Sequence, residues 1–193
     1  MPNQYVFNDN DQPLYVDMVN TFQSPDISAP PEISASQAAV LYSTNTSASS
    51  LVVLSLISAI TSIRISNATG SGKTVYISRI SGSIGGSSLL SAMSGSFTIV
   101  KGGTLTSPAT LTPTNNNLGS AATSAMTVQS STAAISGGTT LYNYQLAPGA
   151  FSQNFTGSII VPPGTAICAN VTSSSSAVGL TITSALGLLW WEQ

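Results

Sequence analysis

Short stretches in which apolar and polar residues alternate recur along the chain, separated by turns rich in Gly, Pro, Asn and Ser. Ile63 and Ile65 alternate with polar neighbours, and so do the apolar residues of 178–182. A period of two gives a strand one apolar face. Further strands are predicted at 74–80, 97–101, 142–146, 158–161 and 166–171. Runs of this length with such turns predict an all-β sandwich or barrel.

The number of strands narrows the fold further. Eight or nine are expected from residue 38 onward, which fits a jelly-roll-like β-sandwich better than a seven-stranded immunoglobulin sandwich. Residues 51–60 could form a helix, but their Val and Ile content favours a strand. The Ser- and Thr-rich residues 104–127 are expected to form long loops, with one short strand at 126–128.

The N-terminal residues have a different composition. Four of the 13 aromatic residues lie in the first 22 positions. Two short apolar strands, 5–7 and 14–19, flank a polar turn at 8–13. We therefore expect an arm that needs a partner and adds as a strand to another subunit. The expected assembly residues of the arm are Tyr5, Val6, Phe7, Leu14, Tyr15, Val16, Val19 and Phe22.

A Pro- and Ser-rich segment, residues 24–37, follows the arm. Prolines break helices, so this segment is predicted to be an extended linker that cannot form a helix. The predicted organisation is an assembly arm with its linker over residues 1–37 and a β-sandwich body over 38–193.

Charge is scarce and unevenly distributed. Charged residues make up 5% of the chain, and residues 102–191 carry none. The first 32 residues hold five carboxylates and no cation, whereas Arg64, Lys73, Arg79 and Lys101 lie in the body. A soluble monomer usually displays mixed surface charge. A body of this kind suits a subunit packed beside copies of itself, with its acidic arm steered toward the basic body.

The same composition excludes several functions. Four Lys and Arg with a pI of about 4.5 cannot build a nucleic-acid-binding face. Histidine is absent and carboxylates are few, so we expect no enzyme, no metal site and no cofactor. A single cysteine gives no internal disulfide. The longest apolar run, residues 51–63, is shorter than the roughly 20 residues that span a bilayer, so no membrane insertion is expected.

Two local motifs have simpler explanations than ligand binding. Residues 70–74, Gly-Ser-Gly-Lys-Thr, resemble part of a phosphate-binding loop, but Asn67 stands where the first glycine is required and a strand follows. A hairpin turn is predicted there. Residues 8–11 offer oxygen ligands at calcium-like spacing but lack the required glycine and distal glutamate, so a polar turn is favoured.

Three residues near the C-terminal end are singled out. Cys168 lies within an apolar strand and is predicted to be a buried structural thiol. Trp190 and Trp191 are adjacent, so on a strand their rings point to opposite faces. One ring is expected to fill the core and the other, assigned to Trp191, to meet a neighbouring subunit. The alternative is that both are half-buried under a loop.

The turn at 67–72 with the strand 73–80, the Pro162-Pro163-Gly164 turn and the Trp-Trp-Glu sequence at 190–192 resemble compact β domains of Gram-positive bacteria and their phages. Those domains occur in spore-surface filaments, the exosporium and virion fibres. The resemblance implies a tumour-necrosis-factor-like jelly roll that assembles as trimers or filaments. Known spore appendage subunits carry N-terminal cysteines that crosslink the fibre, and this arm has none.

Two functions follow as expectations. The first is a non-enzymatic, self-assembling structural subunit of an extracellular filament, spore appendage or virion, which polymerises with copies of itself through its arm. The alternative is a trimeric jelly-roll adhesin that binds a host receptor or glycan, although residues 33–191 offer no carboxylate for sugar binding. No signal peptide is recognised, so synthesis in the cytoplasm is expected. The final location is expected to be extracellular, on a spore surface or virion.

Overall fold

The structure is a computed structural model that describes residues 8–9, 12–13, 30–53, 57–87 and 93–193. The chain divides into two compact units, residues 1–30 and 31–193. We call residues 31–193 the sandwich unit. In the first unit, β1 (Asn8–Asp9) and β2 (Gln12–Pro13) pair antiparallel inside the predicted turn. The predicted strands at 5–7 and 14–19 lie outside the described residues.

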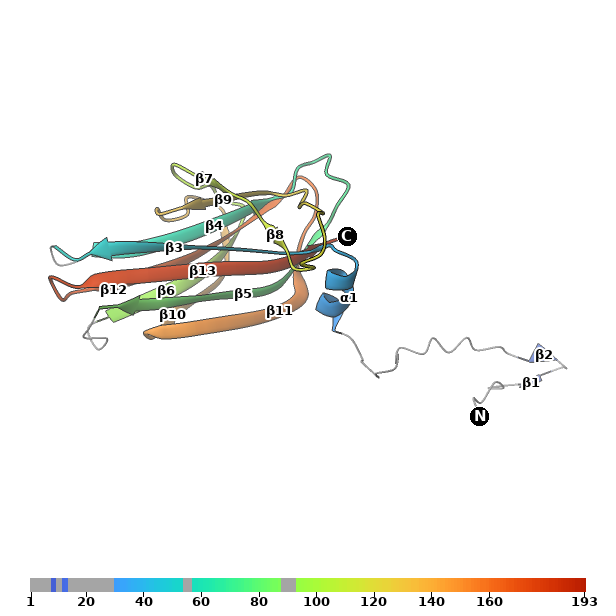
Figure 1. Cartoon of the computed structure of the whole chain (residues 1–193), viewed down its shortest axis with the longest axis horizontal. Helices are drawn as coiled ribbons and strands as arrows, with labels where there is room; N and C mark the ends of the chain where they lie inside the picture. Colours follow the sequence, from blue (N-terminus) through green and yellow to red (C-terminus); the bar gives the residue numbers. More distant parts are fainter. Residues whose placement is uncertain (1–7, 10–11, 14–29, 54–56, 88–92) are drawn as a thin grey trace. The chain divides into compact units, whose positions relative to one another are not determined.

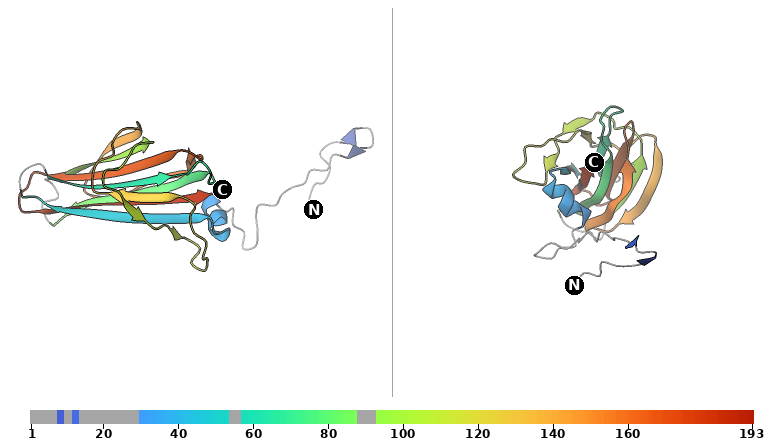
Figure 2. Two further views of the ribbon diagram at one scale, coloured as in Figure 1. Left: turned by 90° about the horizontal axis from the view of Figure 1, so that it is seen from above. Right: turned by 90° about the vertical axis from the view of Figure 1, so that its right-hand side faces the viewer.

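The sandwich unit consists of two antiparallel sheets stacked face to face (Figures 1 and 2). The first sheet has the order β11-β5-β13-β3-β8 and the second β10-β6-β12-β4-β9-β7. The first contains β3 (Leu41–Leu51), β5 (Val75–Gly86), β8 (Thr114–Asn115), β11 (Gly149–Val161) and β13 (Thr181–Glu192). The second contains β4 (Ile57–Ser66), β6 (Met93–Lys101), β7 (Ala109–Leu111), β9 (Thr127–Ser131), β10 (Thr139–Leu146) and β12 (Ala166–Ser175).

The pairing of the eight longest strands is nested. The first, β3, pairs with the last, β13, and likewise β4 pairs with β12, β5 with β11, and β6 with β10. This is the connectivity of a jelly roll, so the predicted fold class is confirmed. Three short strands, β7, β8 and β9, belong to the long connection between β6 and β10, and they bring the described strands of the sandwich unit to eleven.

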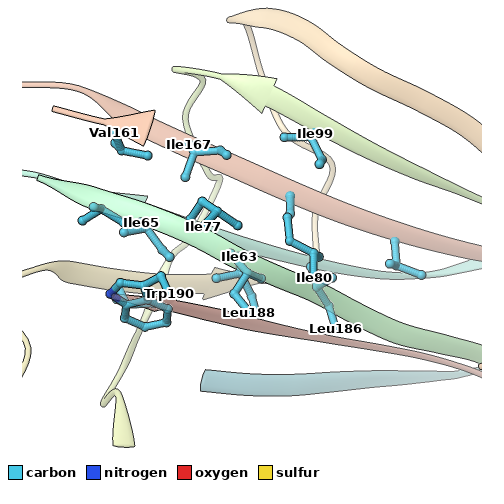
Figure 3. Packing of buried hydrophobic residues seen from close by; sticks show 14 of the residues in the cluster. Ile63, Ile65, Ile77, Ile80, Ile99, Val161, Ile167, Leu186, Leu188 and Trp190 are labelled. Atoms are coloured by element: carbon cyan, nitrogen blue, oxygen red, sulfur yellow. The ribbon is translucent and has the colours of Figure 1, made fainter. Parts of the chain in front are cut away.

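The apolar faces of the two sheets meet in one main core (Figure 3). Ile63 and Ile65 are fully buried there, as the alternation predicted, and so are Phe97 and Trp190. Burying an aromatic side chain removes roughly 150–250 Å² from water, so these two rings contribute much of the hydrophobic stabilisation. Every buried apolar residue of the sandwich unit lies at or after Ala35. Among the described residues, the main core is built from side chains between Tyr42 and Trp190.

One prediction about the linker is wrong. Residues 31–37 form a helix, α1 (Pro31–Gln37), rather than extended chain. Pro31 occupies the first helical position, where the missing N–H has no partner in any helix. The helix ends in a Schellman motif: the Val40 N–H donates to the Ala35 carbonyl, the Ala39 N–H donates to the Ser36 carbonyl, and Ala39 has a φ of 56°.

Strand limits also differ from the predictions in places. Residues 51–60 are not one strand, because β3 ends at Leu51 and β4 begins at Ile57. Val178 lies in the turn before β13 and is 63% exposed, so the strand predicted from 178 starts at Thr181. A loop precedes β5, which begins at Val75, but the predicted hairpin at 70–74 is wrong: β4 and β5 belong to different sheets, so this loop crosses from one sheet to the other. None of the helices among the described residues has the length and apolarity to cross a membrane.

Part of the interior between the sheets is polar. Thr61 Oγ1 and Ser184 Oγ lie 2.7 Å apart, and both residues are buried. Ser173 is fully buried as well, but its hydroxyl has no hydrogen-bond partner among the described residues. A buried polar group without a partner loses its hydration and gains nothing in exchange.

We therefore expect Ser173→Ala to raise the free energy of unfolding by about 1 kcal/mol. Urea denaturation of the two proteins measures the difference. Ser184→Ala is the matched control: it removes a hydroxyl that is bonded in the same interior, so it should lower stability. A loss of stability in Ser173→Ala would contradict the prediction.

Candidate assembly surface

The edge strands β10 and β11 lie on the same side of the sandwich, one in each sheet (Figure 1). They follow one another in the chain and pair inward with β6 and β5 respectively. Within the described residues neither has a partner on its outer side. We call the surface formed by these two strands, residues 139–146 and 149–161, the edge face. It presents a long run of free backbone groups.

The edge face lacks the usual protection of sheet edges. Natural edge strands carry charged residues or prolines that discourage pairing with another chain. Neither β10 nor β11 contains a charged residue or a proline. Each has one irregularity in its pairing, after Thr140 in β10 and after Asn154 in β11, and these are the only protective devices seen in the two strands.

Apolar side chains accompany this free backbone. Leu141, Tyr142 and Ile160 are 45%, 48% and 54% exposed. The Tyr142 ring packs against Phe155 of the facing strand, with ring centroids 5.6 Å apart. A hollow of about 290 Å³ lies beside them, lined by Leu141, Ile160 and Pro162 among others. The edge face therefore combines free backbone with apolar contact area, as an intermolecular sheet edge requires.

Trp190 and Trp191 point to opposite faces of β13, as predicted. The Trp190 ring belongs to the main core beside Tyr42, with centroids 6.2 Å apart. The Trp191 ring lies on the outer face of its sheet and stacks on Tyr76 at 5.4 Å. It forms a small cluster with Ala35 of α1 and Leu41. Helix α1 of the same chain thus covers Trp191, which is 9% exposed, and its predicted contact with a neighbouring subunit remains a prediction.

Two further features fix α1 and the Trp191 ring. The Ser78 hydroxyl donates to Glu32 Oε1 at 2.8 Å, which ties the first turn of α1 to β5. Gly157 has a φ of 86°, and a side chain there would collide with the Trp191 ring. The arm is thus joined to the sandwich through a helix packed on its sheet. Sequence analysis missed this attachment because its signal, a proline at a helix start, was interpreted as a helix breaker.

Glu192 is a buried carboxylate with a structural role. It accepts hydrogen bonds from the Ser124 hydroxyl, the Ala125 N–H and the Trp190 indole N–H, the last two at 2.9 and 3.0 Å. These bonds hold the segment before β9 against the end of β13. Because Glu32 is also bonded within the unit, both side-chain carboxylates of residues 31–193 are engaged in holding the fold together.

Cys168 is buried and free, as predicted. It pairs in register with Arg64 of β4 and Val100 of β6. Burial raises the pKa of the thiol to about 11, and the neighbouring Arg64 opposes this shift only in part. The thiolate is thus disfavoured in the folded protein, which makes Cys168 an unreactive packing residue.

This raised pKa predicts how stability depends on pH. Below the unfolded thiol pKa of about 9 both states are neutral and stability is unaffected. Between about pH 9 and 11 the unfolded thiol ionises while the folded one does not, so stability should fall. Urea midpoints measured from pH 8 to 11 test this. Cys168→Ala should lose less stability over this range, although the raised pKa values of buried Tyr42 and half-buried Tyr144 leave some loss. Equal losses in both proteins would contradict the prediction.

The predicted assembly residues of the arm, from Tyr5 to Phe22, lie outside the described residues, so the structure does not show where they bind. Trp191, the predicted assembly residue outside the arm, is the one that the structure places, and it lies under α1. No protein-family model matches the chain, and no curated protein matches it either.

Proposed function

We propose that this chain is a non-enzymatic structural subunit that assembles with copies of itself. The observation that carries the proposal is the edge face, two neighbouring edge strands without charge or proline that expose Leu141, Tyr142 and Ile160. A monomer with such an edge is prone to pair with other chains. An arm rich in aromatic residues, attached through α1, supplies a second contact between copies.

The proposal also specifies how the subunits join and what they build. The arm of one subunit adds as a strand to an exposed edge of the next, and the product is an extracellular filament, a spore appendage or a virion component. The jelly-roll connectivity and the near absence of charge support this form, because a surface of Ser, Thr, Asn and Gly packs against itself without repulsion. The resemblance to tumour-necrosis-factor-like subunits supports it too.

Electron microscopy of the purified recombinant chain tests the proposal. Filaments or closed shells are expected. Dispersed trimers would instead favour the alternative function, an adhesin for a receptor or glycan. Monomers at every concentration would contradict both. The variant Leu141→Lys with Ile160→Lys places charge on the edge face and should reduce assembly, whereas Leu118→Lys, at a residue 94% exposed away from that face, should not.

Charge also predicts how fast the subunits meet. Residues 1–30 hold four aspartates, whereas residues 31–193 hold all four cations and the two bonded glutamates. Opposite charges steer association, and salt screens them over about 8 Å at 0.15 M and about 3 Å at 1 M. Assembly followed by light scattering should therefore be slower at high salt, with little change in the final yield. A rate independent of salt would contradict this prediction.

A further inference from the structure

A hollow of about 680 Å³ is formed by turns at one end of the sandwich. Its walls come from the β4–β5 turn at 67–69, the glycines 102–103 after β6, the start of β10 at Thr139, and the β11–β12 turn at 164–165. Hollows of roughly 300–1,000 Å³ are the size that binds small ligands or a few side chains. We call it the cationic hollow, for the residues described next.

Two of the four cations of the chain, Arg64 and Lys101, line this hollow. The Arg64 Nε–H donates to the Gly103 carbonyl at 3.1 Å, which holds the guanidinium at the wall. Lys101 is exposed at the end of β6. None of the described residues that line the hollow is acidic, so the site offers positive charge and no carboxylate of its own.

The sandwich unit cannot readily supply the missing anion. Its two side-chain carboxylates are already engaged: Glu32 is bonded to Ser78, and Glu192 is bonded to Ser124, Ala125 and Trp190. The other four carboxylates of the chain are Asp9, Asp11, Asp17 and Asp26, and all of them precede residue 31. No cation lies among those first 30 residues. The charges of the arm and of the hollow are therefore complementary.

We propose that the cationic hollow binds aspartate carboxylates of the N-terminal arm of a second copy of this chain. The proposal rests on the function proposed above and adds its acceptor site: Arg64 and Lys101 hold the acidic part of the arm, while the apolar residues of the arm make the contact that stabilises the assembly. Arg can bind a carboxylate through two parallel hydrogen bonds, and Lys adds a point charge.

A binding experiment tests this contact apart from assembly. The probe is a fluorescent synthetic peptide of residues 1–29, titrated into the full-length chain whose four arm aspartates are changed to asparagine so that its own arm does not compete. At about 0.05 M salt, where charges act over more than about 10 Å, the peptide should bind. Arg64→Gln with Lys101→Gln should lower its affinity by roughly tenfold or more.

The chain offers a matched control. Lys73→Gln with Arg79→Gln removes the same charge at exposed positions that do not line the hollow, and should lower the affinity by less than about threefold. Lys101→Gln alone changes an exposed residue, so it keeps the test valid if the Arg64 variant unfolds. This variant should show an intermediate loss of affinity for the peptide at an unchanged melting temperature.

Three results would overturn the inference: no binding of the peptide, equal losses from the two pairs of substitutions, or binding at the hollow of an acidic oligosaccharide but not of the peptide. Failure of the unmodified chain to form particles in the electron microscope would instead contradict the proposed function. The two failures are read by different measurements and are thus distinguishable.

Discussion

Deletion of residues 1–23 abolishes assembly and leaves a folded sandwich unit: this is the result that we expect from the largest change to the chain. The main core of the described residues is built from side chains between Tyr42 and Trp190, and the deletion removes none of them. The melting temperature should stay within about 2 °C, which for a unit of this size is less than about 1 kcal/mol. Calorimetry measures the folding, and electron microscopy with sedimentation measures the assembly.

The control keeps the length of the arm and removes its apolar side chains. Changing Tyr5, Phe7, Tyr15 and Phe22 to serine in the full-length chain should abolish assembly as the deletion does, because the hydrophobic contact is lost in both. A truncated chain that still builds the same particle would show that the arm has no part in polymerisation and that the edge face alone is sufficient.

The two tryptophans should separate when each is changed to alanine. Trp190 is fully buried in the main core and donates to Glu192, so Trp190→Ala should lower the free energy of unfolding by about 3–5 kcal/mol. Trp191 belongs to the smaller cluster under α1, so Trp191→Ala should cost about 1–3 kcal/mol. Chemical denaturation measures both losses.

The two alanine variants should also differ in their effect on α1 and on the arm that α1 attaches. Without the Trp191 ring, the cluster under α1 loses its largest apolar side chain and α1 should detach more readily, which loosens the attachment of the arm and impairs assembly. Hydrogen exchange over residues 31–40 should therefore accelerate in Trp191→Ala but not in Trp191→Phe, which keeps an aromatic ring on Tyr76. Equal losses in melting temperature for both alanine variants, with assembly intact in each, would refute this account of the C-terminal strand.

Particular strands show how far local patterns determine this fold. The strand β12 (Ala166–Ser175) contains the predicted run 166–171, because a mostly apolar run of this length signals a strand buried between two neighbours. The strand β3 was not recognised as a separate strand, because Leu41–Leu51 consists mostly of Ser, Thr and Asn and exposes every second residue in its later half. It is a strand because β13 supplies eleven paired residues beside it. That pairing joins residues about 140 positions apart and leaves no local pattern.

The features of the candidate assembly surface likewise fall into those that the sequence determines and those that only the tertiary structure decides. By itself the sequence determined an all-β body, an acidic arm rich in aromatic residues, opposed Trp190 and Trp191 rings and a buried Cys168, because these follow from a period of two and from composition. Only the tertiary structure decided that Trp191 lies under α1, that β10 and β11 form an open edge, and that Arg64 and Lys101 share one hollow. The physical reason is that packing between distant segments sets which faces are covered, and no neighbouring residue encodes it.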